Sequence, residues 1–290
     1  MEYSPGLRGV IAGETKISTV GMEGTSLRYR GYDAIKLTET HTYEDAASLI
    51  ISDDLDGSEF TNNFIKYYGE LTNDKDINKL FVEIKSRLHP MDVIRTVVSY
   101  IGDSDKNSDL ESTTKILAAV SYVIASYNDN DTSELDQEYT VASSMLSNKV
   151  STDELQALDD ILILYAEHGF NASTFATRVT ASTRSDLTSS IVSGIGTLKG
   201  ELHGGANERA VELINSFKDI NDAETGVLKM LKEKKKIMGF GHGVYKIQDP
   251  RSPVVKRWVE KLVSDDDAKL RFEIAKNCLL YTSPSPRDKT

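Results

Sequence analysis

Three of the five histidines in this chain stand next to glycine at the predicted boundary of a helix. They are His168 in "EHGFN", His203 in "LHGGAN" and His242 in "GFGHGVY", while His41 and His89 stand among ordinary helix-start residues and are interpreted as structural. A neighbouring glycine leaves the backbone bare, so a ligand can approach it closely. One such histidine would more often be structural, but three in succession favour a site that uses imidazole to move or share a proton.

The setting of His203 predicts which form of its ring is present. If "GGANERAVELI" opens a helix, the free N–H groups of its first turn make a positive pole beside the ring. That pole disfavours the imidazolium and leaves a neutral imidazole, which can donate one hydrogen bond to a developing oxyanion. Such a group suits enolate chemistry, in which a proton leaves a carbon next to a carbonyl.

Two other kinds of site fit the sequence less well. The spacings between His168, His203 and His242 match no zinc-binding pattern, and Cys278 is the sole cysteine, so we expect no metal site. The stretch "GIGTLKG" at 194–200 resembles a dinucleotide-binding loop only vaguely. It follows a helical pattern, whereas such a loop follows a strand.

A second cluster of candidates lies just before and after the third histidine. Four lysines, Lys232, Lys234, Lys235 and Lys236, stand at the end of a predicted helix and lead into "IMGFGHG". Their simplest role is to compensate the helix dipole, but in an acidic chain they could also seat a phosphorylated ligand. Arg251, in "QDPRSP", could bind a carboxylate through two parallel hydrogen bonds.

Composition limits the partners of the whole chain. The 290 residues carry a formal net charge of −11, which repels both nucleic acid and anionic membrane surfaces. No apolar stretch approaches the length of a membrane span, and the N-terminus has no signal-peptide pattern. With a single cysteine, the chain cannot form an internal disulfide. We therefore expect a cytoplasmic protein that binds neither nucleic acid nor membrane.

The pattern along the chain predicts a mostly α-helical fold. Short alternating stretches broken by glycine in the first forty residues predict small strands. Apolar residues then recur at helical spacing, without βαβ alternation. The expected N-caps are Thr42, Ser112 and Ser151, the last with Glu154 in a capping box, and Pro90 is expected at a first helical position.

The candidate histidines stand between helices in this prediction. A helix beginning at Ser151 should run into His168 and stop at Gly169, and further helices should begin at Asn171 and at Ser185–Asp186. The last of these should end near Gly200, directly before His203. Packing of these helices would have to bring the histidines together.

At this point the motifs resemble those of the citrate synthase family. "GLRGVIAGETKIS…LRYRGYD" is similar to its N-terminal signature and "HPMDVIRT" to an internal helix start. "AEHGFNASTFATRVTAST", "GTLKGELHGGANE" and "KKKIMGFGHGVYKIQDPR" resemble its active-site segments, in order. The resemblance spans residues 5 to 280 and is strongest to the short prokaryotic and archaeal members, which include 2-methylcitrate synthases.

The resemblance implies an all-α, two-domain homodimer that condenses acetyl-CoA with oxaloacetate through an enol intermediate. His203 would donate a hydrogen bond to the thioester oxygen, and His242 would bind and polarise the ketone of oxaloacetate. His168 and Arg251 would hold its carboxylates. Acetyl-CoA would be a co-substrate rather than a permanently bound cofactor. The residues implied to line the CoA site are Lys235, Lys236, Ile237, Met238 and Gly239.

The chain departs from the family pattern at its C-terminal end. The family's general base is an aspartate in a later segment that also carries two arginines, and no such segment is found here. We therefore expect a truncated member with little activity: residues 1–203 as a large helical domain, 204–280 as a partial small domain, and 281–290 as a non-native tail.

Two alternatives remain open. One is a 2-methylcitrate synthase that uses propionyl-CoA, because one extra methylene changes binding by only about 1–3 kcal/mol and leaves no mark on the motifs. The other is a non-catalytic helical protein that binds CoA or a protein partner.

Overall fold

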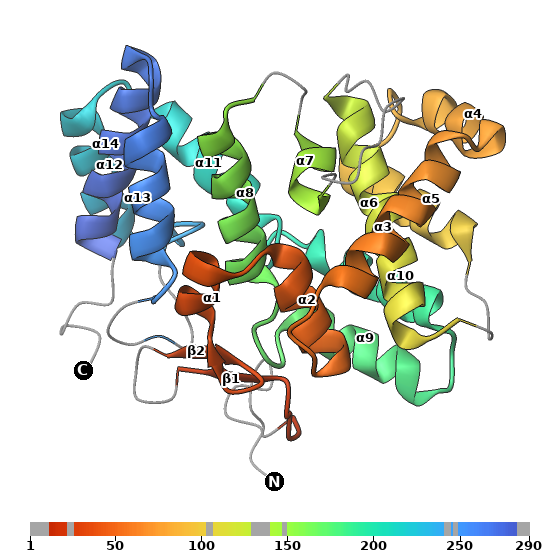
Figure 1. Ribbon diagram of the computed structural model, residues 1–290. Helices are drawn as coiled ribbons and strands as arrows, with labels where there is room; N and C mark the ends of the chain where they lie inside the picture. The colour runs from red at the N-terminus through yellow and green to blue at the C-terminus, as the bar shows by residue number, and fades with distance from the viewer. Residues whose placement is uncertain are drawn as a thin grey trace, which may run out of the picture.

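The computed structural model describes residues 12–21, 26–102, 107–128, 140–146, 150–240, 245 and 249–282. This part of the chain is mostly helical, with one small sheet near the N-terminus (Figure 1). None of its helices combines the length and the apolar character that crossing a membrane requires. The helices are α1 (Ala34–Thr40), α2 (Tyr43–Ser52), α3 (Ser58–Thr72), α4 (Lys75–Ile84), α5 (Pro90–Ile101), α6 (Asp109–Tyr127), α7 (Val141–Met145), α8 (Thr152–Tyr165), α9 (Ala172–Ser182), α10 (Leu187–Leu198), α11 (Ala206–Ser216), α12 (Ile220–Lys232), α13 (Ser252–Leu262) and α14 (Asp266–Thr282).

The sheet confirms the strands predicted near the N-terminus. Its strands β1 (Ser18–Val20), β2 (Leu27–Tyr29) and β3 (Tyr32–Asp33) pair antiparallel in chain order. Between β2 and β3, Arg30 and Gly31 both adopt positive φ, of 48° and 92°, as a tight two-residue hairpin turn requires. The buried Tyr29 donates its hydroxyl hydrogen to the carbonyl oxygen of Ile163, at 2.8 Å, and so ties the sheet to α8.

Helix starts follow the capping chemistry of the sequence at most positions. Thr42 and Ser151 each form the two hydrogen bonds of a capping box, and Pro90 is the first residue of α5. The predicted cap at Ser112 is wrong: α6 begins one turn earlier, after Ser108, whose side chain accepts from the Glu111 amide. Ser112 is instead buried inside α6, because a complete capping box at Ser108 satisfies the first-turn amides.

Two predicted helix ends also differ from the structure. Helix α8 ends at Tyr165, so His168 lies in the connection to α9 rather than within a helix that stops at Gly169. Gly169 has a φ of +65°, a conformation that glycine adopts without strain and that a helix cannot continue. Helix α14 runs to Thr282, two residues into the predicted tail, and the rest of that tail lies outside the described residues.

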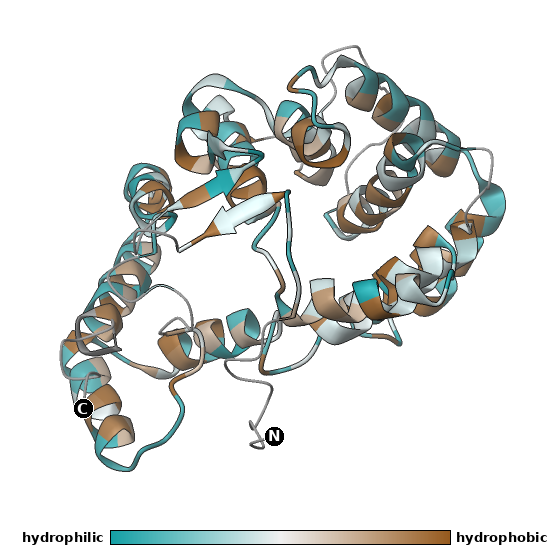
Figure 2. Ribbon diagram, turned by 90° about the horizontal axis from the view of Figure 1, so that it is seen from below, coloured by the Kyte–Doolittle hydropathy of each residue, from teal (hydrophilic) through white to brown (hydrophobic). Residues whose placement is uncertain are grey.

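The apolar side chains gather into separate clusters. The largest cluster joins α3, α4, α5 and α6, and a second lies between the sheet, α1, α2 and α8. A third joins α11, α12 and α14, which Figure 1 shows on the opposite side of the molecule from α3 to α6. Most helices carry brown, apolar residues along one side and teal, polar residues along another (Figure 2). The division at residue 203 into two domains stays a prediction.

Helix α13 crosses from the C-terminal part of the chain to α8. Val254 and Trp258 pack with Ala157 and Leu164 of α8. The indole N–H of Trp258 donates to a carboxylate oxygen of Asp160, at 2.6 Å, and both side chains are buried. This contact places Arg251, the N-cap of α13, next to Tyr165 at the end of α8, just before the connection that carries His168.

Candidate active site

His203 lies in a tight turn between α10 and α11. We call residues 199–208 the His203 turn; it contains the whole connection and the first three residues of α11. A Cβ atom built on Gly204 would lie 2.5 Å from the carbonyl oxygen of Leu198, and one on Gly205 would lie 2.9 Å from that of Lys199. The two glycines therefore let the turn pack directly on the end of α10. Their predicted role in admitting ligands stays a prediction.

The ring of His203 contacts the N-terminus of α9. The backbone N–H of Ser173 donates to His203 Nε2 at 3.3 Å, and the Ser173 hydroxyl oxygen lies 2.9 Å from the same nitrogen. Asn171 caps α9 by accepting from the Thr174 amide, and it also accepts from the Ser173 hydroxyl. An amide can only donate, so its contact with Nε2 favours the tautomer that carries the ring hydrogen on Nδ1, and the Ser173 hydroxyl then shares its one hydrogen between Asn171 Oδ1 and Nε2.

The helix N-terminus that meets the ring is another one than predicted. We expected the start of α11, which follows His203 directly, to supply the positive pole. The N–H that meets the ring instead belongs to Ser173, in the first turn of α9. Which helix N-terminus meets the ring does not follow from the sequence alone, because it depends on how α9 packs against α10.

His168 contacts Tyr245, a residue that the sequence analysis did not select. The His168 Nε2 lies 3.1 Å from the Tyr245 hydroxyl oxygen, and the two rings meet edge to face with centroids 5.5 Å apart. Tyr245 is almost fully buried, at 1% exposure, and this burial raises the pKa of its hydroxyl to about 12. Tyr245 thus stays protonated at neutral pH and fixes the orientation of the His168 ring.

Arg251 lies on the same tyrosine. Its guanidinium stands 5.9 Å from the centre of the Tyr245 ring and 4.7 Å from that of Tyr165, within the range of cation–π attraction. Asp249 accepts from Arg251 Nε at 3.0 Å and from Nη2 at 2.7 Å. Burial alone would lower the pKa of Arg251, but the hydrogen bonds to Asp249, the charge of Asp249 and the nearby Tyr165 and Tyr245 together outweigh it and raise the pKa. The Arg251 guanidinium therefore stays charged, and Asp249 fixes its orientation.

The structure thus brings His168 and Arg251 together around one side chain. We call His168, Tyr165, Tyr245, Asp249 and Arg251 the Tyr245 cluster. The connection that carries His168 also leads, through Asn171 and Ser173, to the His203 ring. A predicted carboxylate-binding pair and a predicted hydrogen-bond donor are therefore linked by one short segment of chain. His242 lies outside the described residues, so its place in this site stays a prediction.

The predicted CoA-binding residues lie along α11. Gly239 has a φ of +80°, and a Cβ there would lie 2.2 Å from the Cβ of Ala210, so the segment passes directly over that helix. Ile237 packs against the cluster of α11, α12 and α14. Lys235 and Lys236 are exposed, with Lys235 Nζ 2.7 Å from a carboxylate oxygen of Glu233. The lysines remain accessible to an anion, and Met238 is half-buried between them and Gly239.

Sequence reasoning missed three residues that orient the site. Ser173 could have been found, because it stands two positions after the recognised cap Asn171 and so has an amide that no helical carbonyl accepts from. Tyr245 and Asp249 stand inside "KKKIMGFGHGVYKIQDPR", the segment quoted for the family resemblance, but neither was given a role there. In the described part of the chain, no three His, Cys, Asp or Glu side chains gather so as to hold a metal.

The chain is similar to known proteins over most of its length. The family described as "Citrate synthase, C-terminal domain" matches residues 6–283. A 2-methylcitrate synthase of Shewanella oneidensis is 40% identical over 95% of this chain and 78% of its own length. A citrate/2-methylcitrate synthase of Bacillus subtilis is 36% identical over 90% of this chain and 74% of its own. The citrate synthase of Thermoplasma acidophilum, solved with carboxymethyl coenzyme A and oxaloacetate, superposes with a TM-score of 0.84 at 25% identity, over 96% of this chain and 77% of that one.

Proposed function

The chain belongs to the citrate synthase family of condensing acyltransferases, and from that premise we propose that it joins the methyl carbon of acetyl-CoA to the ketone carbon of oxaloacetate through an enol intermediate. The observation that carries the proposal is the Ser173 amide on His203 Nε2. With Nε2 accepting from that amide, the ring hydrogen is on Nδ1, from which it would donate to the thioester oxygen as the α-proton leaves. Charge developing on that oxygen is then stabilised where it forms.

The Tyr245 cluster has the chemistry to bind the second substrate. Arg251 keeps its charge, and its guanidinium has further N–H donors besides the two that bind Asp249. His168 is held beside it by Tyr245. We assign both to the carboxylates of oxaloacetate and His242 to its ketone. The α-proton must pass to a base, a role to which the sequence assigns no residue in this chain. The enol carbon then attacks the ketone carbon, the ketone oxygen takes a proton, and water hydrolyses the resulting thioester to the free acid and CoA. Lys235 to Gly239 would line the CoA site.

Oxaloacetate binding tests this assignment without depending on turnover. A ligand at about 100 times its Kd stabilises the folded state by about 2.7 kcal/mol, which raises the Tm of a chain of this size by about 5 °C. Arg251→Lys keeps the charge but loses the planar fork and should abolish most of that shift. Arg257→Lys, on the exposed side of the same helix, is the matched control and should keep it. No shift in the wild-type chain would favour the non-catalytic helical protein instead.

Propionyl-CoA is a second candidate substrate. The relatives from Shewanella oneidensis and, at 38% identity, Corynebacterium glutamicum are named 2-methylcitrate synthases. The two acyl groups differ by one methylene, which a pocket can discriminate by about 10- to 200-fold. Measuring CoA release with each acyl-CoA, at one oxaloacetate concentration, decides between them. A higher kcat/KM for propionyl-CoA would make the chain a 2-methylcitrate synthase.

We also propose that the chain forms a homodimer through α9 and α10. Helix α9 buries none of its residues and packs against α10, while Phe175 and Val179 remain 37% and 51% exposed. An apolar face that remains uncovered on a soluble chain suits a second copy. Light scattering should give twice the chain mass, and Val179→Glu should give the monomer. Val82→Glu, on the exposed face of α4, should leave the mass unchanged.

The cellular location is proposed on the sequence. With one cysteine, the chain gains nothing from an oxidising compartment. The proposed substrates, oxaloacetate and an acyl-CoA, are also consistent with that location. We propose that the enzyme is cytoplasmic, which cell fractionation tests.

A further inference from the structure

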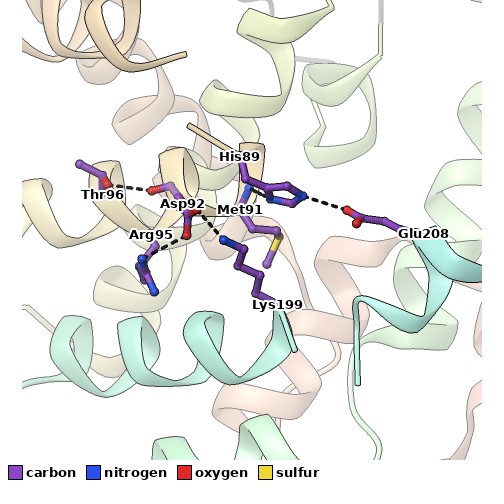
Figure 3. Close-up of polar contacts among 7 residues, drawn as sticks. All are labelled: His89, Met91, Asp92, Arg95, Thr96, Lys199 and Glu208. Carbon is purple, nitrogen blue, oxygen red and sulfur yellow. Dashed lines mark hydrogen bonds and ion pairs between the residues drawn. The ribbon is translucent and has the colours of Figure 1, made fainter. Parts of the chain in front are cut away.

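The first turn of α5 contacts the His203 turn at both of its ends (Figure 3). Before the histidine, Lys199 donates from Nζ to Asp92 Oδ2 at 2.6 Å. After it, Glu208 Oε1 lies 3.1 Å from His89 Nε2. Both partners on the other side, His89 and Asp92, belong to the same helix start. Two contacts from one rigid element therefore bracket the residue that the proposed chemistry needs.

The orientation of His89 is determined by its second role as the N-cap of α5. Its Nδ1 accepts from the backbone N–H of Met91, at 3.2 Å. Because Nδ1 accepts, the hydrogen of the neutral ring is on Nε2, which donates to the Glu208 carboxylate. One imidazole thus uses both nitrogens at once, one for its own helix and the other for α11. A residue that serves only as a cap would not need the second nitrogen.

Asp92 is the more enclosed of the two contacts. Its side chain is 19% exposed, and its oxygens bind Lys199 and, at 3.1 Å, Arg95 Nη2. The hydrogen bond from Lys199 lowers the pKa of Asp92, so the carboxylate stays charged. Charge-assisted bonds of this length are stronger than neutral ones and fix direction as well as distance.

The helix that makes these contacts is itself firmly placed. Val93, Val97 and Val98 of α5 are fully buried in the largest apolar cluster. The His203 turn, in contrast, has an exposed Glu201 and an exposed Leu202, and its glycines contribute no side chain. The turn therefore obtains its position from α5 and from the end of α10 rather than from burial of its own residues.

We propose that His89 and Asp92 are positioning residues, which hold the two ends of the His203 turn to α5 and thereby keep the His203 ring against Ser173. The inference rests on the role proposed above for His203. Each ion pair on its own is partly exposed and contributes little to the stability of the fold. Acting at the two ends of one turn, they restrict where the ring between them can lie.

Two substitutions of His89 separate its two contacts. His89→Asn keeps an excellent helix cap but cannot reach Glu208, whereas His89→Gln keeps a donor at the Nε2 position but is a poor cap. The readout is the ring ¹⁵N signal of His203 in histidine-labelled protein, with hydrogen exchange of residues 199–208. We expect His89→Asn to shift the signal and to speed exchange about two- to fivefold. His89→Gln should leave both near wild type.

Asp92→Asn should act in the same direction as His89→Asn, with a larger increase in exchange of about tenfold because its contact is charge-assisted and more enclosed. Arg95→Ala is the matched control: it removes the other ion pair of Asp92 but touches no residue of the His203 turn. It should leave the His203 signal unchanged.

Glu208→Gln tests the contact from the exposed side, where a change cannot unfold α5. It should reproduce part of the His89→Asn shift. The proposal is wrong if His89→Asn, Asp92→Asn and Glu208→Gln all leave the His203 signal and the exchange of residues 199–208 at wild-type values. Oxaloacetate-dependent stabilisation of the wild type reports on the proposed function separately, so the two failures are distinguishable.

Discussion

The His203 turn and the Tyr245 cluster orient an imidazole in opposite ways. In the first, a backbone amide meets the ring and ion pairs hold both ends of a partly exposed turn. In the second, one almost fully buried aromatic ring contacts His168 on one side and Arg251 on another. The first arrangement depends on polar contacts that contribute little stability, and the second on burial that contributes a great deal. The two regions should therefore respond differently to substitution.

The largest effect should come from removing the buried ring. Tyr245→Ala leaves a cavity between His168 and Arg251, which should lower the free energy of unfolding by about 3–5 kcal/mol. Urea denaturation measures this loss. Tyr100→Ala, at a position 53% exposed, should cost far less. Equal losses for the two variants would remove the distinction between the two regions.

The free energy of unfolding should itself depend on pH near neutrality, through a buried carboxyl group. Burial, followed by the charge of Glu44, raises the pKa of Asp159 to about 7. The folded chain then retains a proton that the unfolded chain releases above about pH 4. The contribution of Asp159 to stability should be most favourable below that pH, become less favourable as pH rises towards 7, and level off above it, by up to about 4 kcal/mol in all.

Asp159→Asn should flatten this pH profile and raise stability at neutral pH. Glu39→Gln, on an exposed carboxylate of α1, should leave the slope as it is. Thermal unfolding between pH 4.5 and 8 makes the comparison. An Asp159→Asn variant whose stability has the same pH slope as the wild type would contradict the assignment to Asp159.

A smaller effect should follow a substitution in the His203 turn. Gly204→Ala puts a methyl group where the Leu198 carbonyl oxygen stands, so the backbone must shift, at a cost of about 1–3 kcal/mol. Gly196→Ala is the control, since its new methyl would meet only Arg95 Nη1, at 3.6 Å. In a helix that change should stabilise the chain by about 0.4–1 kcal/mol. Opposite signs for the two variants support a packing role for Gly204.

The smallest expected effect separates the hydroxyl of Tyr245 from its ring. Tyr245→Phe keeps the buried ring and loses the contact to His168, which should cost about 0.5–1.5 kcal/mol. The same variant should weaken oxaloacetate binding, because His168 then loses the hydrogen bond that orients its Nε2. Calorimetric titration measures the affinity. Unchanged affinity would mean that packing alone orients His168.

Local chemistry made much of the fold predictable. The capping boxes at Thr42 and Ser151, the proline that opens α5 and the caps at Asn171 and Asp186 are each readable within a few residues. The error at Ser112 was avoidable by the same rules, because Ser108 has Glu111 at capping-box spacing, whereas Ser112 has Lys115 there.

Contacts between segments far apart in the chain could not be predicted from the sequence. The histidines were recognisable by their glycine neighbours, but the amide that meets His203 comes from α9, and the ring that meets His168 comes from Tyr245. His89 was interpreted as structural, and its cap supports that, yet its second nitrogen reaches Glu208 on α11. These pairings follow from how helices pack, and no local pattern encodes them.

The central claim is that the His203 turn and the Tyr245 cluster are two halves of one substrate site. Titrating histidine-labelled protein with oxaloacetate and following the ring ¹⁵N signals of His168 and His203 tests it directly. Both signals should shift with one common titration midpoint, while the signal of His41 should not move. A shift of His168 alone, or two different midpoints, would contradict it.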